Sequence, residues 1–417
     1  MSNHHGFAKL KTILFSTLFI AMAIIALIMP WRPTKSAIEK RTLAKFPTLT
    51  VTNLINGKNL DQITTWYADT FPGREELMSL NATLKQAYGL HQTQVVGQVN
   101  QTAAPQHAAK INRAAKLHGV DEKMNNLFIT GDRAYSMYGF VPGVLTDYAH
   151  AITDFAKQVG PEVHVYDVIV PTSSGIYLDA ATTKELGGSD QQQAINFAYR
   201  KMGKQVATVN AFKAIDNHSK EDLYFRTDHH WTAKGAYYAY QALMAKMKQP
   251  VSPLSDYRVR KFPGFLGTSY AYSNQSPALK KHPDTVVAYQ PKATNELTYR
   301  DRDGQTQSAK IIADATQYDE ANKYMTFIAG DQPFEEINNP KLHDGSSIVV
   351  VKESFGNAFT PFLVNNFEHV YVVDYRYYDG KLADLVREKH IQNVVFLNNI
   401  SAASTDTLVG SLIDLLK

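Results

Sequence analysis

The sequence predicts an α/β protein whose core is a parallel β-sheet flanked by helices. In the C-terminal part of the chain, short apolar strands alternate with helices in three successive pairs, which are 347–351 with 357–366, 369–374 with 381–390, and 393–397 with 401–416. Continuous apolar strands followed by helices are typical of a parallel sheet that is covered on both faces. Hydrophobic residues also make up 44% of the 417 positions, which is enough for a substantial core.

The upstream part of the chain is less regular, but its apolar spacing and its turn residues still predict elements. The expected elements are a helical segment over 53–89 with a break at 71–73, a loop or loosely packed mobile helix over 92–118, a hairpin around 127–132, a helix over 144–159, a strand over 163–170, a short strand over 224–226 and a helix over 235–247. Residues 257–317 contain strand-like fragments without a clear order. We therefore expect a mixed insertion around 250–320.

An apolar segment near the N-terminus predicts an export signal. Lys9 and Lys11 precede an almost entirely apolar run, 13–29, which lies at the lower limit for spanning a bilayer and exceeds the usual core of a cleaved signal. No obvious cleavage site follows, and Trp31 suits the membrane interface. A buried core helix is the alternative. We expect residues 1–31 to be an uncleaved signal anchor, a single transmembrane helix that leaves the C-terminal domain on the extracytoplasmic side of the cell membrane.

The remaining chain is expected to form a stalk and one large domain. Residues 32–60 are mostly polar and contain two prolines, which suits a stalk. Residues 61–417 hold the strand and helix pattern described above and are expected to form the folded domain. The chain contains no cysteine, so disulfides, thiolate metal sites and cysteine nucleophiles are excluded. Lys and Arg outnumber Asp and Glu by only 43 to 39 without a basic stripe, so nucleic acid is not an expected partner.

Two loops at predicted strand ends are rich in reactive side chains. In α/β sheets such groups collect at the carboxyl ends of the strands. Residues 226–232 follow the short strand, and residues 352–357 follow the apolar strand that begins the C-terminal pairs. Ser354 lies at a strand-to-helix turn, where the amides of the next helix can support an oxyanion during acyl transfer. A helix cap is the alternative role for Ser354.

The spacing of Asp228 and His230 supplies what a serine nucleophile needs. A serine requires a base to take its proton, and the base requires an acceptor that fixes its tautomer. Residues two apart in an extended segment point the same way, so Asp228 and His230 can lie side by side while His229 faces elsewhere. The sequence therefore predicts a Ser354, His230 and Asp228 triad. A metal site and a structural histidine pair are the other interpretations, although a metal site would want further clustered ligands.

Several motifs resemble those of the DHHW protein family. Residues 227–232 (Thr-Asp-His-His-Trp-Thr), followed by Gly235-Ala236-Tyr237, look like the signature of that family. Further matches are residues 71–74, 330–333, 352–357 with 362–363, and 374–378. DHHW proteins are similar to the SGNH-like domains of the alginate acetylation proteins AlgX and AlgJ. Together the motifs span the chain from about residue 66 to its C-terminus.

The resemblance implies an SGNH-hydrolase-like (flavodoxin-like) fold with a permuted motif order, in which Asp228 and His230 precede Ser354. Family members usually carry Asp before the serine, whereas this chain has Glu353. SGNH folds take oxyanion-binding groups from the strands after the serine. The corresponding positions here are Arg376, Asn398 and Asn399, and Phe355 is grouped with them as an oxyanion- or substrate-binding residue. A surface ion pair for Arg376 and helix capping for the two asparagines are the alternatives.

The resemblance also implies a function. Ser354 would attack an acetyl ester, His230 would transfer its proton, and Asp228 would orient the imidazole. The expected activity is extracytoplasmic O-acetyl transfer to an exported cell-surface or extracellular polysaccharide, with an MBOAT-family membrane acyltransferase as partner and with no cofactor or metal. A carbohydrate esterase and an inactive polysaccharide-binding or scaffold protein are the alternatives.

Overall fold

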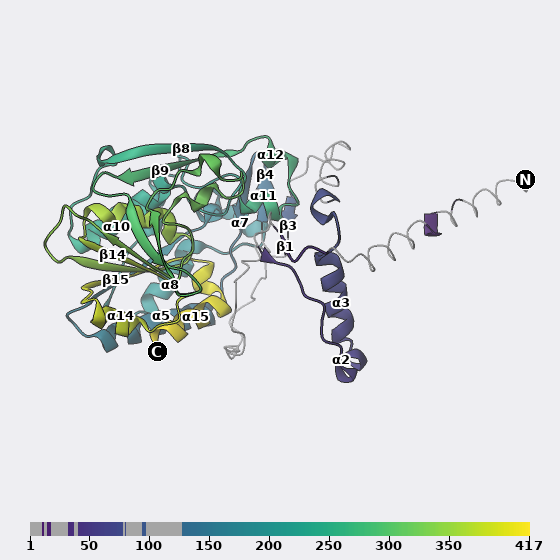
Figure 1. Ribbon diagram of the computed structural model, residues 1–417, viewed down its shortest axis with the longest axis horizontal. Coiled ribbons are helices and arrows are strands. Elements are labelled where there is room, and N and C mark those ends of the chain that lie inside the picture. The colour runs from purple at the N-terminus through teal and green to yellow at the C-terminus, as the bar shows by residue number, and fades with distance from the viewer. Residues whose placement is uncertain are drawn as a thin grey trace, which may run out of the picture. The chain divides into compact units, whose positions relative to one another are not determined.

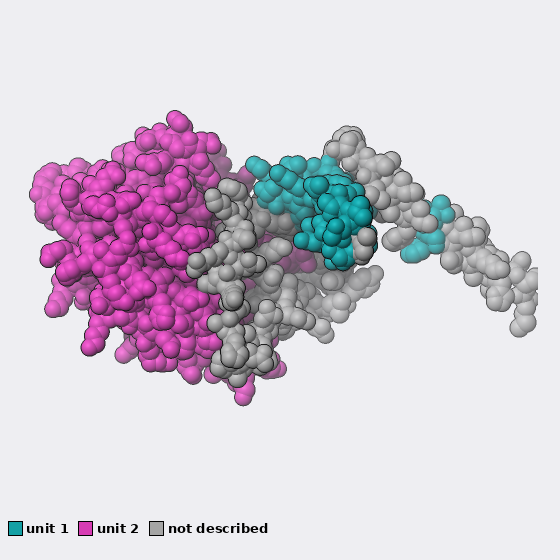
Figure 2. Space-filling model, turned by 90° about the horizontal axis from the view of Figure 1, so that it is seen from below, with its two compact units in different colours: residues 1–90 teal, residues 91–417 magenta. Residues whose placement is uncertain are grey.

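The computed structural model describes residues 32–36, 41–77, 94–96 and 127–417, together with positions 11, 15–17 and 80. The chain divides into two compact units, residues 1–90 and residues 91–417 (Figure 2). The boundaries predicted for a stalk and a folded domain stay predictions, because a division into compact units does not test them. All the side chains with candidate chemistry lie in the second unit.

The first unit contains two short strands and two helices with described bounds, and residues 74–77 are helical as well. Strands β1 (Lys35–Ser36) and β2 (Arg41–Thr42) pair antiparallel, and helices α2 (Val51–Ile55) and α3 (Lys58–Asp69) follow. Gly57, with a φ of 78°, separates the helices, so the predicted helical segment has a break before the one expected at 71–73. Arg32 lies over the ring of Trp66 and donates a hydrogen bond to Thr70 Oγ1 at 2.8 Å.

The predicted signal anchor lies outside the described residues except for positions 11 and 15–17. Among the residues that the structure describes, no helix is long and apolar enough to span a bilayer. This finding contradicts the predicted location as a single-pass membrane protein with an extracytoplasmic domain, and we do not retain that location. The longest described helix, α5 (Pro142–Val159), is amphipathic. It buries apolar residues on one face and carries polar residues on the other, whereas a membrane-spanning helix is apolar all round.

An eight-stranded sheet forms the centre of the second unit, with the strand order β11-β10-β12-β14-β13-β15-β6-β7 (Figure 1). Five strands are parallel, namely β6 (His164–Val170), β7 (Val206–Thr208), β13 (Ser347–Lys352), β14 (His369–Asp374) and β15 (Asn393–Asn399). Three further strands pair antiparallel at one edge, namely β10 (Glu296–Arg300), β11 (Thr306–Lys310) and β12 (Phe334–Asn338). The predicted parallel sheet is therefore corrected to a mixed one, because two strands of the expected insertion extend it.

Helices cover both faces of the sheet, as predicted. Helices α5, α14 (Leu382–Glu388) and α15 (Asp406–Leu416) pack together on one side, and α9 (Ala211–Asp216), α10 (Ala233–Met247) and α13 (Gly356–Phe359) pack together on the other (Figure 1). The central strands are buried from both sides, and the apolar stretch of β13 is fully inaccessible from Ile348 to Val351. This double coverage is the reason that the strands read as continuous apolar runs in the sequence.

The other described elements surround this framework. The predicted hairpin is confirmed as β4 and β5, and Gly131 takes the left-handed turn position with a φ of 59°. The elements are β3 (Gln94–Val96), β4 (Leu127–Thr130), β5 (Arg133–Ser136), α6 (Ser173–Tyr177), α7 (Ala180–Glu185), α8 (Gln191–Lys201), β8 (Tyr257–Phe265), α11 (Thr268–Tyr272), α12 (Pro277–Lys280), β9 (Asp284–Pro291) and the 3₁₀ helices η1 (Leu254–Asp256), η2 (Ala315–Gln317), η3 (Lys323–Thr326), η4 (Thr360–Asn365) and η5 (Ala402–Ser404).

Two local predictions are wrong. Residues 224–226 form no sheet strand, because Tyr224 makes only an isolated antiparallel bridge to Trp231 and its hydroxyl donates to the Pro171 carbonyl at 2.6 Å. Tertiary burial, not strand pairing, explains the apolar residues there. The helix expected over 357–366 is the short α13 followed by the 3₁₀ helix η4, where Pro361 lacks the amide that an α-helix would use.

Candidate active site

Ser354 lies at the carboxyl end of β13, in the tight turn that leads into α13. The β13 residues pair with β14 and β15 up to Lys352, and the chain then leaves the sheet. Gly356 folds back against the Lys352 side chain so closely that a Cβ at this glycine would lie 2.5 Å from the Lys352 Cβ. The turn therefore needs glycine there. Ser354 itself is 6% exposed.

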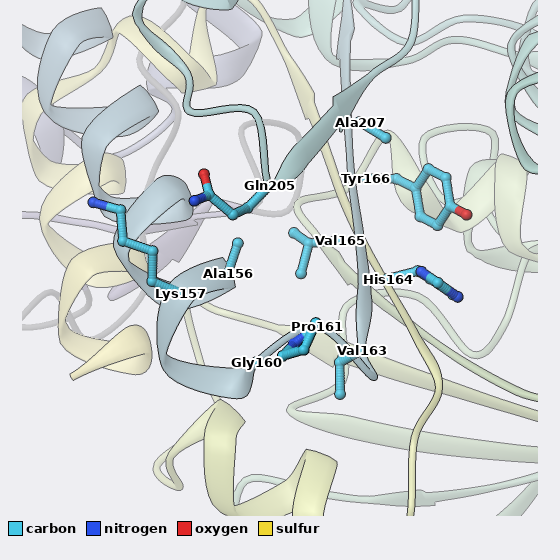
Figure 3. Close-up of a pocket in the computed structure, with 10 residues that line it drawn as sticks. All are labelled: Ala156, Lys157, Gly160, Pro161, Val163, His164, Val165, Tyr166, Gln205 and Ala207. Atoms are coloured by element: carbon cyan, nitrogen blue, oxygen red, sulfur yellow. The ribbon is translucent and has the colours of Figure 1, made fainter.

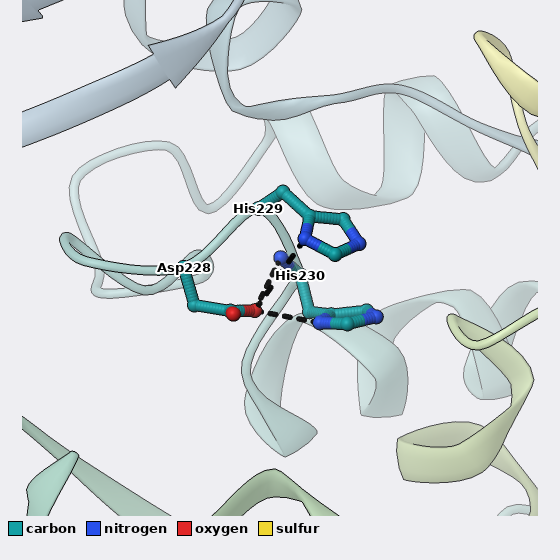
Figure 4. Close-up of side chains that lie close together, drawn as sticks. All are labelled: Asp228, His229 and His230. Carbon is teal, nitrogen blue, oxygen red and sulfur yellow. Dashed lines mark hydrogen bonds and ion pairs between the residues drawn. The ribbon is translucent and has the colours of Figure 1, made fainter. Parts of the chain in front are cut away.

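The loop that carries Asp228 and His230 lies between α9 and α10. Asp228 Oδ1 accepts a 3.0 Å hydrogen bond from the His230 amide, a contact that holds the aspartate against the backbone two residues on. Thr232 caps α10 by accepting from the Gly235 amide at 3.3 Å. Figure 4 shows the Asp228 carboxylate beside the His230 ring. The His229 ring lies against the His230 ring, with the centroids 3.8 Å apart, so it does not face elsewhere as the spacing predicts.

The structure brings the three predicted triad residues together. His230 Nδ1 lies 2.6 Å from Asp228 Oδ1, and His230 Nε2 lies 2.7 Å from Ser354 Oγ. All three side chains are nearly buried, at 3% exposure for Asp228 and 6% for His230. A hydroxyl, an imidazole and a carboxylate in one hydrogen-bonded row are the arrangement in which a serine becomes a nucleophile.

Asp228 is surrounded by groups that favour its charged form. Burial alone would raise the pKa of Asp228, but the neighbouring His230 and His229 rings and the hydrogen bonds from His230 hold this pKa well below its usual value. The Thr268 amide and hydroxyl both donate to Asp228 Oδ2, at 2.8 and 2.9 Å. Thr268 begins α11, so a segment distant in the sequence completes the carboxylate's environment.

Aromatic rings fix the imidazole from the side. The Tyr324 ring stacks on His230 with the centroids 4.0 Å apart and the planes 10° from parallel, and its hydroxyl donates to the Ser354 carbonyl at 3.1 Å. Trp231 is fully buried and donates from Nε1 to the Phe355 carbonyl at 2.9 Å. Tyr324 comes from η3, and no local pattern in the sequence around it indicates this role.

Glu353, the departure from the usual family residue, is fully buried behind the serine. Its Oε1 accepts from the Asn399 amide at 3.0 Å, and its Oε2 accepts from the Phe355 amide at 3.2 Å and lies 3.3 Å from Ser354 Oγ. The longer side chain thus joins the ends of β13 and β15. The Ser354 hydroxyl has two acceptors in reach, and His230 is the nearer.

The backbone amides after the serine are mostly engaged within the turn. The Phe355 amide donates to Glu353, the Gly356 amide donates to the Glu353 carbonyl at 2.9 Å, and the Asn357 amide donates to the Ser354 carbonyl at 3.2 Å. Within residues 127–417, the Ser354 amide donates no hydrogen bond that would occupy it. It is therefore the backbone donor best suited to an oxyanion on the attacked carbon.

The proposed oxyanion- or substrate-binding residues are placed differently from the expectation. Arg376 donates from Nε and Nη2 to the two oxygens of Asp374, at 2.8 and 2.7 Å, so that its fork faces a buried carboxylate. Phe355 is 1% exposed and packs its ring beside His230 and Trp231. Phe355 therefore packs against the triad loop, and Arg376 forms a buried ion pair with Asp374.

The two asparagines are also turned to structural partners. Asn398 accepts from the Tyr375 hydroxyl at 2.8 Å and donates to the Tyr148 hydroxyl at 3.1 Å. The Asn399 side chain accepts from the Ser401 and Ala402 amides at 2.9 and 3.0 Å, the capping alternative considered above. Neither side chain is brought to the hydroxyl of Ser354.

The metal interpretation rests on Asp228, His229 and His230, whose ligand atoms lie within 4.8 Å of one another. His230 Nδ1 and Asp228 Oδ1 are hydrogen-bonded at 2.6 Å, a contact that leaves no space for a cation between them. The other His230 nitrogen meets Ser354. An ion could keep at most part of this set, so the arrangement fits proton transfer better than metal binding.

Two cavities lie at the amino-terminal ends of the parallel strands, opposite the end that carries Ser354. One, of about 480 Å³, lies at the start of β6 and includes Lys157, Gln205 and Val165 in its lining (Figure 3). Another, of about 500 Å³, lies beside the same strand near Lys248 and Asn393. Because β13 is parallel to β15 and β6, these amino-terminal ends are remote from the Ser354 turn.

The chain is similar to several proteins of known structure. No curated protein matches it significantly. A DHHW family protein from Eubacterium siraeum is 30% identical, with a TM-score of 0.62, over 69% of this chain and 94% of its own. PatB1 from Bacillus cereus with a sulfonyl adduct is 18% identical, with a TM-score of 0.57, over 69% of this chain and 97% of its own, a likeness that shows the fold alone.

A third similar structure is the O-acetyltransferase domain of AlgJ from Pseudomonas putida. It is 15% identical over 69% of this chain and 98% of its own, but its TM-score of 0.34 is too low to support an argument. The model of the DHHW protein family matches residues 39–113 and 105–373. The resemblance expected from the motifs is thereby confirmed, and the chain belongs to the DHHW family.

Proposed function

We propose that the protein transfers an O-acyl group, with acetyl as the expected group, to a polysaccharide through a covalent intermediate on Ser354. The observation that carries this proposal is the continuous hydrogen-bonded row from Asp228 through His230 to Ser354 Oγ. The same row could serve an esterase, since both activities share the first half of the reaction. The acceptor of the acyl group is the only chemical difference between them.

The first half-reaction follows from the positions of the groups. Ser354 Oγ attacks the ester carbonyl while its proton passes to His230 Nε2, and the resulting imidazolium is stabilised by the Asp228 carboxylate. The Ser354 amide faces the developing oxyanion. As the carbon–oxygen bond of the donor breaks, His230 returns the proton to the leaving alcohol. An acyl-serine remains.

In the second half-reaction the acceptor hydroxyl gives its proton to His230 Nε2 and attacks the acyl-serine, and the proton then returns to Ser354. The sugar hydroxyl as acceptor, and delivery of the acyl group by an MBOAT-type acyltransferase, are supported by the family resemblance. Tyr324 favours both halves of the reaction, because its ring holds the imidazole in one plane while protons move in opposite directions.

Substitution of the nucleophile tests the proposal. Ser354→Ala is expected to lower the release of acetate from a chromogenic ester, and the acetylation of an oligosaccharide acceptor, by at least about a thousandfold, because the oxyanion donor and binding alone give little rate. Mass spectrometry after treatment with a sulfonyl fluoride should find the adduct on Ser354 in the unsubstituted protein.

The control is Ser347→Ala, which removes another buried hydroxyl, from the opposite end of β13. Full acetylation by a folded Ser354→Ala protein would sink the catalytic proposal and favour a polysaccharide-binding or scaffold role. Acetate release that does not fall when an oligosaccharide is supplied, with no acetylated sugar formed, would identify an esterase.

A further inference from the structure

Four charged side chains form a group beside the Ser354 turn, and the buried Glu335 lies within electrostatic reach of three of them. Lys352 Nζ, fully buried, lies 3.1 Å from Asp374 Oδ2 and 3.3 Å from Asp331 Oδ1. Arg376 Nη2 lies 2.7 Å from Asp374 Oδ2 and 3.0 Å from Asp331 Oδ2. Each carboxylate thus meets both cations, and the charges of the group cancel.

Within this group, Asp331 is the member that reaches the turn from both sides. Its Oδ1 accepts from Asn357 Nδ2 at 2.8 Å, and Asn357 in turn donates its backbone amide to the Ser354 carbonyl. The same oxygen meets Lys352, which precedes the serine by two residues. One carboxylate oxygen therefore ties the chain before the nucleophile to the chain after it.

The two cations strengthen the link that Asp331 makes between the two sides of the turn. Burial raises the pKa of Asp331 by itself, but Arg376 and Lys352 together hold this pKa well below its ordinary value. Burial lowers the pKa of Lys352, yet Asp374 and Asp331 raise it overall. Removing one partner from such a buried set leaves an uncompensated charge, so the group resists rearrangement. Asp331 retains 29% side-chain exposure and is the accessible edge of the group.

We propose that Asp331 is a positioning residue for the nucleophile, and that it acts on Ser354 through Asn357 while Arg376 and Lys352 hold it in place. This proposal rests on the proposed function. It also assigns Arg376 a task other than oxyanion binding, because the guanidinium fork is directed at Asp374 and Asp331. A serine that attacks a carbonyl must be held within a fraction of an ångström, and a turn tied at both ends supplies this restraint.

The consequence is a specific pattern of kinetics. In Asp331→Ala the serine still has its base, so substrate binding should be kept while productive geometry is lost. We expect kcat to fall about ten- to a hundredfold with KM changed less than about twofold. Asp331→Asn keeps an acceptor for Asn357 but not the charge, and should recover part of this loss.

The experiment combines Asp331→Ala with Asn357→Ala. Because Asp331 is proposed to act through Asn357, the double variant should be no slower than the slower single variant, a non-additivity typical of groups that act as a unit. Each kcat is expressed per serine titrated with a sulfonyl fluoride, so that misfolded protein does not count. Glu336→Gln is the matched control, since it removes a carboxylate of similar exposure that pairs with Lys389 at 3.2 Å and has no contact with the turn.

Two results would overturn the proposal. One is a kcat per titrated serine in Asp331→Ala within twofold of the unsubstituted protein, which would leave Asp331 with a structural role alone. The other is full multiplication of the two single effects in the double variant. Failure of the proposed function is visible separately, as the absence of a sulfonyl adduct on Ser354 together with activity that survives Ser354→Ala.

Discussion

At the scale of single residues, the two adjacent histidines have unequal tasks. His230 meets both Asp228 and Ser354, whereas His229 Nδ1 meets the Thr268 hydroxyl, which itself donates to Asp228. His229 therefore supports the carboxylate through Thr268 and through a longer direct contact of 4.0 Å between its Nδ1 and Asp228 Oδ1. The triad needs the second histidine, while a metal site built from this cluster would need both as ligands.

Substitution of each histidine distinguishes the triad from a metal site. His230→Gln is expected to lower kcat/KM for a chromogenic ester by at least about a thousandfold, because no base then faces Ser354. His229→Gln should cost less than about tenfold, since Asp228 keeps the Thr268 and His230 donors. Equal losses from the two variants would contradict the triad and favour a shared ligand role.

The residue pattern explains how much of the site could be predicted. The spacing of Asp228 and His230 is local, so the sequence alone indicates that they lie side by side. Thr268 and Tyr324 come from segments distant in the chain, and nothing near them marks a contact with the imidazole or the carboxylate. Arg376 follows the end of β14, as the strand pattern predicts, but its pairing with the buried Asp374 can be identified only from the structure.

At the scale of elements, the segment after β8 closes over the Asp228 carboxylate. A Cβ added to Gly267 would lie 2.2 Å from Asp228 Oδ2 and 2.3 Å from the Asp228 Cβ. Asp228 cannot retreat from such a side chain without losing the hydrogen bonds that the Thr268 amide and hydroxyl donate to the same oxygen. The start of α11 and the loop before α10 thus fit together only with glycine at this position.

Gly267→Ala is accordingly expected to lower kcat/KM by at least about tenfold through displacement of Asp228, because small misplacements at a reacting centre are costly. Gly410→Ala is the control, since nothing lies within 4 Å of its added Cβ in α15. Ester hydrolysis and thermal unfolding are measured for both. An active Gly267→Ala protein would show that the segment moves aside without cost.

Element by element, the strands that are buried on both faces were the predictable ones. β13 is apolar from Ile348 to Val351, which is the pattern of a strand covered on both faces. The edge strand β11 and its neighbour β10 are mostly polar, so their joining of the sheet depends on pairing that only tertiary structure supplies. Tyr224 and Phe225 show the converse case. They are apolar because they are buried against other segments, so the sequence predicts a strand where the structure has none.

At the scale of the whole molecule, a buried acid makes stability depend on pH. Asp167 is fully buried in β6, where burial raises its pKa to about 8 despite the hydrogen bond from Tyr148. The folded state therefore keeps a proton that the unfolded state, with a pKa near 3.8, gives up. Stability is greatest below the lower value and falls as the pH rises toward about 8.

Asp167→Asn should remove this dependence. Urea unfolding between pH 5 and about 8.5 is expected to show a decline of the order of 1.4 kcal/mol per pH unit from this group in the unsubstituted protein and a flatter profile in the variant. Asp154→Asn, at an exposed carboxylate paired with Lys157, is the control. Parallel profiles for all three proteins would show that Asp167 ionises without cost.

The order of strands in the sheet has a consequence for how the molecule acquires its activity. Strand β15 is the last strand in the chain, yet it lies between β13 and β6. The partners His230 and Ser354 are separated by 124 residues. Loop closure over such distances slows folding. Because Glu353 accepts from the Asn399 amide at the end of β15, we expect the nucleophile turn to reach its final geometry only after β15 has paired between β13 and β6.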